Sequence, residues 1–322
     1  MPDVSILILG DLIIDETWYV EVTRLNPEAP VPTAELTGVQ PYREPGGAGF
    51  AAAWAASQGL KVSFISAVAE QNTPRLSKYG INVYSPWDNC DLNVTKTRYI
   101  DRNSGYHLMR LDNDRLVARP NTSPGSVIEI MEQIIKCNRI DVCLISDYCK
   151  GFFHDNVPWK EVLLWLQTNR IPTILDTRAR YTTAWTGSDA SIPYAWTKLN
   201  DRELKRILKS LNWNLDDNGE SIIRNKIFSR LLVTHGKDGA HAYEAIQSEI
   251  LDSKEKPNVC VYGYAADTDP RLTPDPTGCG DIFDVAFISS IGAGKSTRDA
   301  LEYAVKTATK FAYIPLKDKF NG

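Results

Sequence analysis

The chain has 322 residues, with 36 Lys and Arg against 40 Asp and Glu, so its formal net charge is −4. This mild acidity argues against a protein that mainly binds the DNA or RNA backbone, because such proteins need a net basic footprint. A chain of this length buries roughly three quarters of its unfolded surface, so it needs neither disulfides nor a structural metal to fold.

The first part of the chain is rich in short strand patterns. Residues 4–9 (VSILIL) form an apolar, β-branched run that is typical of a buried strand. Further strands, some with one polar face, are predicted at 17–22, 33–40, 61–68, 94–101 and 105–111. An Ala-rich run that starts at Gly46-Gly47 and stops at Gly59 predicts a helix.

The rest of the chain alternates helices and strands. Helices are predicted at 124–137, 156–168, 201–209, 219–227, 279–291 and 297–311. Strands are predicted at 141–146, 171–176, 194–199, 229–234, 239–244 and 258–263. This alternation favours an α/β fold with a mainly parallel central sheet and helices on both faces. The polar-faced early strands break the rhythm, so we expect a small β-strand lid, from about 16–44 and 94–112, on a single domain that spans 1–322.

The cysteines and the apolar runs indicate the compartment. Six cysteines and four histidines show neither CxxC nor HxxxH spacing, which argues against a structural zinc site. Scattered cysteines in a chain of this length are typical of reduced thiols in a cytosol. No run approaches the roughly 18 apolar residues that a membrane span needs. We therefore expect a cytoplasmic protein that binds neither membrane nor nucleic acid.

The clearest chemical motif is Asp275-Pro276-Thr277-Gly278-Cys279-Gly280-Asp281. Its alternate glycines let the backbone turn tightly and present successive N–H groups where a helix begins. A helix N-terminus favours negative charge, so this loop suits an anion that develops during phosphoryl transfer. Asp281, in the first turn, is placed to take the proton of a hydroxyl that attacks phosphorus. The alternative is that Asp281 only complements the helix dipole, and spacing alone does not decide between the two.

This motif resembles the D-T-x-G-A/C-G-D signature of the ribokinase-like (PfkB) carbohydrate kinases. Four other motifs of that family have matches in the same order over nearly the whole chain. They are Gly10-Asp11 with Asp15, Pro45-Gly46-Gly47-Ala48, Asn200-Asp201-Arg202-Glu203, and Thr234-His235-Gly236-Lys237-Asp238-Gly239. The resemblance implies a ribokinase-like fold and an ATP-dependent sugar kinase that uses Mg²⁺.

Within the family, the chain is most similar to the D-glycero-D-manno-heptose 7-phosphate kinases of lipopolysaccharide-precursor synthesis. The similarity lies in Trp18-Tyr19 with Arg24 and residues 27–32 (PEAPVP), in Lys96-Thr97-Arg98 with Arg110-Leu111-Asp112, and in Ser146-Asp147-Tyr148-Cys149-Lys150-Gly151. It implies a heptose 7-phosphate that is phosphorylated at its anomeric hydroxyl. Bifunctional members add a nucleotidyltransferase domain; we expect this chain, which matches the kinase portion, to be the stand-alone kind.

The resemblance also implies a role for each matching residue. Asp281 would be the general base, beside an anion hole made by the N–H groups of Gly278, Cys279 and Gly280. ATP would be bound by Lys198, Asn200, Glu203, Thr234, Gly236 and Gly239, with Asn200 and Glu203 organising Mg²⁺ through water. The sugar would contact Asp11, Asp15, Gly46 and Gly47. Its existing phosphate would be bound by Arg98, Arg110 and Lys150, since a guanidinium fork suits phosphate geometry.

These residues also have structural interpretations. Asp11 and Asp15 are common types for a turn after a strand, and Lys150 fits an ordinary loop. Arg98 and Arg110 fit a hairpin in which they pair with Asp101 or Asp112. Glu203 fits the first turn of a helix, and His235 has no acidic partner nearby in the sequence. For the lid, exposed strand edges favour docking, so we expect a homodimer through the lid strands.

Two departures from the family pattern concern the sugar. The family usually has an Asn after its Gly-Gly motif that contacts sugar hydroxyls, and Phe50 stands in that place. A bulky apolar ring there would change which sugar fits, or how it lies. The usual G-x-D-x-x-G stretch is replaced by Ala69-Glu70-Gln71-Asn72, which predicts a shortened flanking helix.

Other readings of the sequence are weaker. Gly292-Ala293-Gly294-Lys295-Ser296 ends like a Walker A loop, but Ser289 stands where that motif needs its first Gly. We interpret it as a turn between two helices, with Ser296 or Thr297 capping the second. Gly10-Asp11 lacks the GxGxxG of dinucleotide-binding oxidoreductases. Two alternatives stay open: a family kinase for another sugar, sugar phosphate or nucleoside, and a non-catalytic sugar- or nucleotide-binding protein on the same fold.

Overall fold

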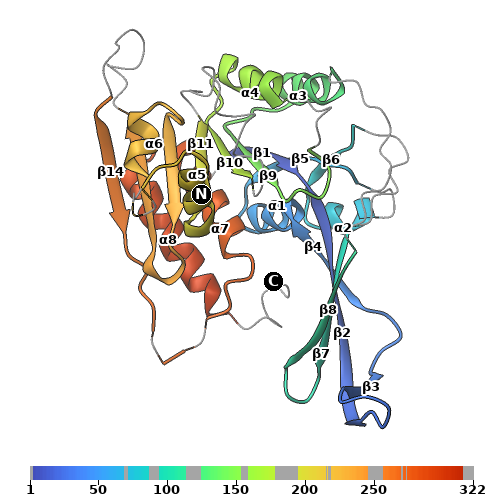
Figure 1. Ribbon diagram of the computed structural model, residues 1–322. Coiled ribbons are helices and arrows are strands. Elements are labelled where there is room, and N and C mark those ends of the chain that lie inside the picture. Colours follow the sequence, from blue (N-terminus) through green and yellow to red (C-terminus); the bar gives the residue numbers. More distant parts are fainter. Residues whose placement is uncertain are drawn as a thin grey trace.

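The computed structural model describes residues 3–68, 72–86, 94–113, 125–153, 159–177, 195–214, 216, 219–245, 257–269, 271–272 and 274–314. Nine strands form the body of the protein: β1 (Ser5–Gly10), β5 (Lys61–Ile65), β6 (Asn82–Tyr84), β9 (Val142–Asp147), β10 (Thr173–Thr177), β11 (Ala195–Asn200), β12 (Arg230–Thr234), β13 (Ala240–Ala245) and β14 (Val259–Tyr264). Their order in the sheet is β14-β13-β12-β11-β10-β9-β1-β5-β6 (Figure 1). Neighbours from β6 to β12 pair in parallel, and β13 pairs antiparallel with both β12 and β14. The predicted mainly parallel α/β fold is confirmed.

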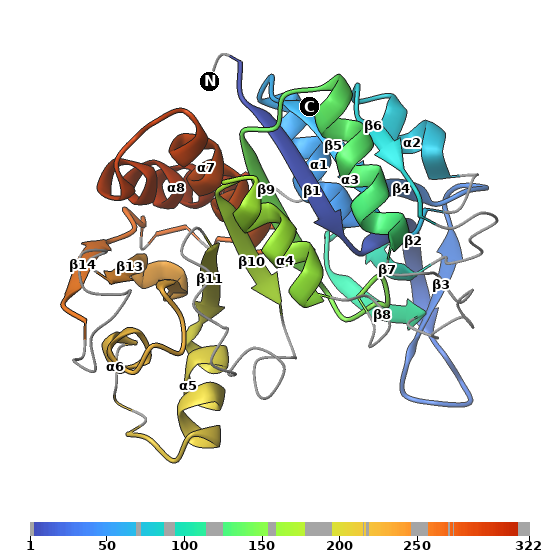
Figure 2. The same cartoon turned by 90° about the horizontal axis from the view of Figure 1, so that it is seen from above.

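Helices cover both faces of this sheet (Figure 2). One face carries α1 (Ala48–Ser57), α7 (Cys279–Gly292) and α8 (Thr297–Ala312), and the other carries α3 (Gly125–Cys137), α4 (Trp159–Thr168), α5 (Asp201–Ser210) and α6 (Glu220–Arg224). Alternate residues of β1 explain the arrangement, because side chains of a strand point to opposite faces. Ile6 and Ile8 join the core that includes α1 and α7, whereas Leu7 and Leu9 join the core of α3 and α4.

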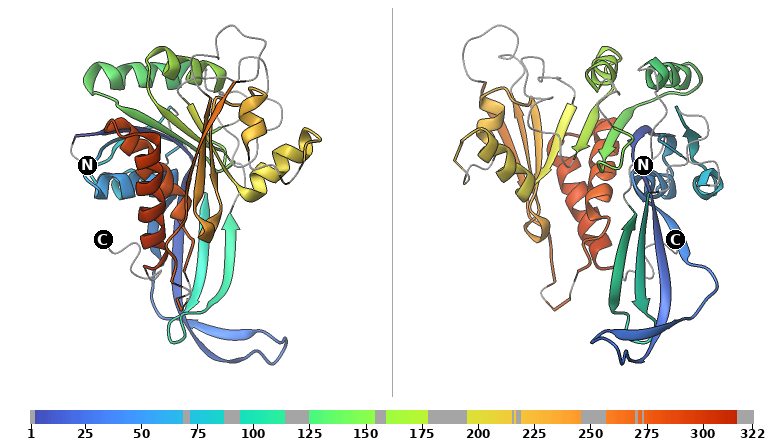
Figure 3. Two further views of the ribbon diagram at one scale, coloured as in Figure 1. Left: turned by 90° about the vertical axis from the view of Figure 1, so that its left-hand side faces the viewer. Right: turned by 45° about the vertical axis from the view of Figure 1, so that its right-hand side comes forward.

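A second sheet projects from this body as a lid (Figure 3). It consists of β2 (Leu12–Leu25), β3 (Pro32–Leu36), β4 (Tyr42–Gly47), β7 (Thr95–Asp101) and β8 (His107–Asn113). Their order is β3-β2-β7-β8, and β4 pairs with β2. Because β2 has 14 residues, it starts in the buried core and continues into the exposed part of the lid. The lid therefore stands at the end of β1, where the body strands also end.

Three elements differ from the sequence-based expectation. β2 begins at Leu12 rather than at residue 17, because its first three residues are all buried and do not alternate. β4 was not expected: Pro and two Gly disfavour a strand, and only its pairing with β2 makes it one. The short strand β6 was not expected either, whereas α2 (Thr73–Ser77) lies where a shortened helix was predicted. The five-residue α2 is the helix that follows β5, and residues 69–71 lie outside the described part of the chain.

The turn between α7 and α8 has the predicted form. Gly294 adopts a positive φ of 78°, and the Ser296 hydroxyl accepts a hydrogen bond from the Asp299 amide at 3.2 Å as the cap of α8. The interpretation as a helix–helix turn rather than a phosphate loop is confirmed. Within the described ranges, no helix has both the length and the apolar character needed to cross a bilayer.

Candidate active site

A cavity of about 980 Å³ lies between the lid and the carboxyl ends of the body strands. In open α/β sheets this is the edge where ligands bind. Its wall includes most of the predicted site residues: Asp15, Gly47, Arg98, Arg110, Lys198, Asn200, Glu203, Thr234, Gly236, Gly239, Gly278, Cys279, Gly280 and Asp281. The remaining three, Asp11, Gly46 and Lys150, do not line it. Motifs spread over the whole sequence therefore meet at one place.

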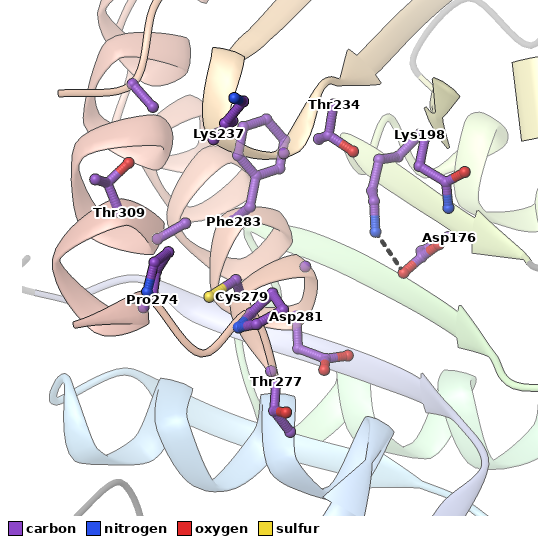
Figure 4. A pocket seen from close by; sticks show the side chains of 18 of the residues that line it. Asp176, Lys198, Thr234, Lys237, Pro274, Thr277, Cys279, Asp281, Phe283 and Thr309 are labelled. Atoms are coloured by element: carbon purple, nitrogen blue, oxygen red, sulfur yellow. Dashed lines mark hydrogen bonds and ion pairs between the residues drawn. The ribbon is translucent and has the colours of Figure 1, made fainter. Parts of the chain in front are cut away.

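The glycine loop begins α7 in the expected way. Gly278 is the residue before the helix, with a positive φ of 81°, and Asp281 lies in the first turn. Asp281 is only 6% exposed, yet it contributes to the cavity wall (Figure 4). The Cys279 amide donates to the Pro276 carbonyl at 3.1 Å, so this one of the three predicted anion-hole amides also closes the turn. The anion-hole role of the loop stays a prediction.

Phe50, which replaces the family's usual Asn, packs against this loop. It is 8% exposed, and its ring lies 5.8 Å from that of Phe311 between centroids. A Cβ built on Gly278 would be 2.6 Å from Phe50 Cε1, so the ring fills the space beside the glycine. Phe50 therefore also lines the cavity at the point where the loop turns.

Gly278→Ala is expected to lower both stability and activity. The backbone at this position has a positive φ, which disfavours any side chain, and the added Cβ would collide with Phe50. We expect a loss of about 2 kcal/mol in the free energy of unfolding and a fall of at least roughly tenfold in kcat, since the loop shifts. Gly294→Ala is the matched control, with a φ of 78° and no atom within 4 Å of its Cβ. Equal activity losses in the two variants would show that backbone strain, rather than the position of the loop, matters.

Tyr148 contacts the predicted base. Its hydroxyl donates to Asp281 Oδ1 at 2.6 Å, although the two residues are 133 positions apart. Tyr148 lies in the loop after β9 and lines the cavity. It stands in one of the stretches that resemble the heptose kinases, but nothing in that pattern assigned it a role.

A buried ion cluster adjoins the cavity, and two of its members, Lys198 and Asp176, line the cavity wall (Figure 4). Lys198 Nζ is 2.7 Å from Asp176 Oδ2 and 3.2 Å from Asp284 Oδ2. Burial disfavours the ammonium, but the two carboxylates outweigh it and raise the pKa of Lys198 above its ordinary value. Burial likewise raises the pKa of Asp284, which is 1% exposed. A side chain on Gly280 would come within 3.3 Å of Nζ, so the ammonium adjoins the glycine loop.

The Asn-x-x-Glu motif forms a capping box at the start of α5. Asn200 Oδ1 accepts from the amides of Arg202 and Glu203 at 3.0 Å each, and Glu203 Oε2 accepts from the Asn200 amide at 2.9 Å. The structural interpretation of Glu203 as a first-turn residue thus holds. Both side chains also border the cavity, so their roles toward ATP and Mg²⁺ stay predictions.

Asp11 holds the loop after β9. Its carboxylate accepts from the amides of Tyr148 at 2.8 Å, Lys150 at 3.0 Å and Phe152 at 2.6 Å. The side chain is 3% exposed. This corresponds to the turn-forming alternative for Asp11, and its predicted contact with a sugar, like that of Lys150 with a phosphate, stays a prediction.

The lid side of the cavity, where the sugar contacts are predicted, is strongly charged. Arg98 Nη1 lies 2.6 Å from Asp15 Oδ1, so its partner is Asp15 rather than either of the acids expected in the hairpin. Arg110 does pair with Asp112, at 2.7 Å. Gly46 adjoins this group from outside the cavity wall: a Cβ there would be 2.2 Å from Asp15 Oδ2, so the glycine makes room for the carboxylate.

A row of three hydrogen-bonded side chains adjoins the predicted nucleotide loop. His235 Nδ1 is 2.6 Å from Asp201 Oδ1, and His235 Nε2 is 2.9 Å from His241 Nδ1. Burial and then the charge of His235 lower the pKa of His241. Asp201 lies 34 positions from His235, so this acidic partner could not be predicted from the residues around the histidine. These hydrogen bonds connect the first turn of α5 to the loop at Thr234–Gly239.

Several cavity residues were not predicted from the sequence. They are Lys96, Tyr148, Asp176, Arg202, Arg206 and Lys237. Asp176 ends a predicted strand, and an acid at the carboxyl end of a parallel strand is a recognisable signal. The others are charged or aromatic residues of ordinary loops, helices and strands, and only the fold brings them to the site.

Comparison with known proteins agrees with this geometry. Residues 10–311 match the family model described as pfkB family carbohydrate kinase. Among solved structures, phosphofructokinase-2 from Escherichia coli in complex with fructose-6-phosphate aligns with a TM-score of 0.65 at 17% identity, covering 98% of this chain and 97% of that one. Ribokinase from Arabidopsis thaliana, complexed with ribose and ATP, aligns with a TM-score of 0.66 at 16% identity, covering 96% and 93%. These likenesses show the ribokinase-like fold.

Curated relatives share about a quarter of the aligned residues with this chain. The bifunctional protein HldE of Coxiella burnetii is 24% identical over 307 residues, and that of Shewanella denitrificans is 25% identical over 306. Each match covers 93% of this chain but only 58% of the relative. The family model, in contrast, spans nearly the whole chain. The chain therefore belongs to the pfkB family of carbohydrate kinases, a family of phosphotransferases that act on sugar hydroxyls.

Proposed function

We propose that the protein transfers the γ-phosphoryl group of ATP to a heptose 7-phosphate, at the anomeric hydroxyl. The observation that carries the proposal is a cationic face of the lid that meets the cavity beside the glycine loop. Lys96, Arg98 and Arg110 all border this cavity, which also contains Asp281. An acceptor that already bears a phosphate would match such a face, because guanidinium groups bind phosphate with a forked pair of hydrogen bonds.

The register of the lid strands supports a bound anion. Arg98 and Arg110 are directly opposite each other in the β7–β8 pair. Like charges in this position destabilise a sheet. The carboxylates of Asp15 and Asp112 pair with the two arginines and reduce the repulsion. The reduction is only partial, because Lys96 adds a further positive charge on the same face. A phosphate between the two arginines would offset the repulsion. The proposed sugar phosphate would therefore bind under the lid.

In the proposed reaction, Asp281 takes the proton of the acceptor hydroxyl as its oxygen attacks the γ-phosphorus in line. The O–P bond to the acceptor forms and the bond from the γ-phosphorus to ADP breaks. The amides of the glycine loop and the Lys198 ammonium would stabilise the charge on the transferring group. A closed lid would exclude water and so limit hydrolysis of ATP.

ATP would bind between the loop at Thr234–Gly239 and α8, next to Lys198. For Mg²⁺, Asn200 and Glu203 supply an amide and a carboxylate oxygen, which are ligand types that this ion prefers. Since both side chains complete the capping box, they would hold the ion through water. When bound, Mg²⁺ would neutralise charge on the phosphates.

The test is ATP consumption with a panel of acceptors: heptose 7-phosphate, fructose 6-phosphate, ribose and a nucleoside. We expect turnover with heptose 7-phosphate and formation of a bisphosphate whose new phosphate is at the anomeric position, as read by ³¹P NMR. Turnover only with another acceptor would assign the kinase to that sugar or nucleoside. Binding of sugar and nucleotide without any turnover would favour a non-catalytic binding protein and overturn the proposal.

Arg110→Ala is expected to weaken the phosphorylated acceptor more than its unphosphorylated analogue. Loss of one charge-assisted contact corresponds to an increase of roughly tenfold or more in KM for the phosphorylated sugar. Arg102→Ala is the control, because Arg102 lies in the turn of the same hairpin and does not line the cavity. Equal changes for both acceptors would remove the phosphate role of Arg110.

We also propose that the lid strands form a homodimer. Met109 and Leu111 are each 50% exposed, and they alternate with Arg110, so they point away from the cavity side of the lid. Leu36, on β3, is 59% exposed. An apolar sheet face of this kind fits a second copy of the same lid, which would cover it.

Leu111→Lys is therefore expected to convert the dimer into a monomer. A charged ammonium at the centre of an apolar interface loses its hydration without a partner. Sedimentation velocity measures the change, and Leu164→Lys is the control, because Leu164 is a 56% exposed leucine on α4, far from the lid in sequence. A parent protein that is monomeric, or a Leu111→Lys variant that stays dimeric, would contradict the proposed interface.

A further inference from the structure

Tyr148 joins the base to a rigidly held loop. Its hydroxyl donates to Asp281 Oδ1 at 2.6 Å. Its own amide donates to Asp11 Oδ2 at 2.8 Å, and the same carboxylate accepts from the amides of Lys150 and Phe152. Three backbone hydrogen bonds to a buried carboxylate therefore fix the loop from which the phenol reaches the base.

We propose that Tyr148 is a positioning residue that keeps Asp281 ionised and oriented for proton transfer. A phenol that donates to a carboxylate stabilises its ionised form and forms a short, directional hydrogen bond. Such help matters at this site, because Asp281 is 6% exposed and burial disfavours its charge. The proposal rests on the role of Asp281 as the general base.

The charged groups around Asp281 have opposite effects on its ionisation. On its own helix, Asp284 carries a second carboxyl group, and Asp176 on β10 carries a third. Asp284 repels a charge on Asp281, whereas Lys198 on β11 attracts it. Because the Lys198 ammonium is already shared between Asp176 and Asp284, the Tyr148 hydroxyl supplies a further, uncharged stabilisation of the base.

Tyr148 also meets the lid. Lys96 Nζ, from β7, lies 5.5 Å from the centroid of the Tyr148 ring, which is within the range of a cation–π interaction. Lys96 is on the cavity side of the lid, next to the predicted phosphate site. One residue therefore contacts both the base and the strand that would cover the sugar.

The first test is Tyr148→Phe, which removes only the hydroxyl. We expect the acidic limb of the kcat/KM profile to move to higher pH by about one unit, because the ionised base loses a charge-assisted hydrogen bond. The KM of the sugar is expected to change less than about threefold, since the ring stays in place. Tyr79→Phe is the matched control: Tyr79 donates to the buried Glu44 at 2.6 Å and does not line the cavity. An unmoved acidic limb would overturn the proposal.

The second test needs no sugar, so it separates this proposal from the proposed acceptor. In protein labelled with ¹³Cγ-aspartate, the Asp281 signal is identified by its absence in Asp281→Asn and is then titrated by NMR. We expect its pKa to be higher in Tyr148→Phe than in the parent and in Tyr79→Phe. An identical titration in all three proteins would overturn the role of Tyr148, even if no acceptor of the panel is phosphorylated. A raised value with no turnover would leave it standing while the proposed acceptor fails.

Discussion

Asp281→Asn is expected to lower kcat by about a thousandfold, which is the range that a positioned general base contributes. The amide has nearly the same size as the carboxylate, and its oxygen still accepts the hydrogen bond from Tyr148, so the loop keeps its shape. It has no basic oxygen for the proton of the acceptor hydroxyl. We therefore expect ATP and the sugar to bind with nearly parental affinity, as measured by calorimetry.

The control for this variant is a carboxylate next to the same sheet, with a side chain that is 8% exposed. Asp141 precedes β9 at the opposite end of the strands, and it accepts from the Ser5 amide at 2.9 Å. Asp141→Asn is expected to leave kcat unchanged. Near-parental turnover in Asp281→Asn would refute the base assignment, whereas a loss of binding together with turnover would point to a structural role for Asp281.

The topology determines which structural element contributes each group of residues to the site. α7 places Asp281 and the glycine loop, and the carboxyl ends of β10 and β11 place Asp176 and Lys198. The lid contributes the cations of β7 and β8. In the proposed function, the groups for phosphoryl transfer thus lie in the body, and the groups that would contact the phosphate of the acceptor lie in the lid. This arrangement fits a family in which the acceptor varies while the transfer reaction stays the same.

Most of the body could be predicted from the sequence because its local patterns and its tertiary structure agree. β9 and α5, for example, match their predicted ranges within one residue, since an apolar β-branched run and a capped amphipathic helix are unambiguous. The lid was harder. β4 contains Pro45, Gly46 and Gly47, and its strand form depends on pairing with β2 rather than on its own residues.

The site was predictable only where motifs are local. The glycine loop and Asp281 are neighbours in the sequence, so their common location was expected. Lys198 and Asp284 are 86 positions apart, and nothing in their separate surroundings relates one to the other. The role of Asp11 illustrates the same limit, because a carboxylate after a strand looks the same whether it contacts a ligand or the backbone of a distant loop.

Lys198→Met is expected to cause the largest loss of stability among single substitutions at the site. Methionine keeps the length of the side chain but removes the ammonium, which leaves the carboxylates of Asp176 and Asp284 buried without it. Their side chains are 7% and 1% exposed, so water cannot replace the lost partner. Removing one member of a buried ion pair costs about 3–5 kcal/mol in the free energy of unfolding. Urea unfolding near pH 8 measures the loss.

The pH dependence of this loss distinguishes unpaired charge from poor packing. Without Lys198, burial and mutual repulsion raise the pKa values of the two carboxyl groups in the folded state above those of the unfolded chain. The folded variant then binds more protons than the unfolded one, so its stability rises as the pH falls from about 8 to about 5. In the parent, the raised pKa of Lys198 contributes stability that is fully present throughout this window, because the window lies below the pKa of an unfolded lysine.

The stability deficit of Lys198→Met should therefore shrink on acidification, and adding Asp284→Asn should reduce this deficit at pH 8. Lys61→Met is the control, because the ion pair of Lys61 with Asp3 is solvent-exposed and should matter little. A deficit that is independent of pH, or equal in the two lysine variants, would contradict the assignment of Lys198 as the counter-ion of two buried carboxylates.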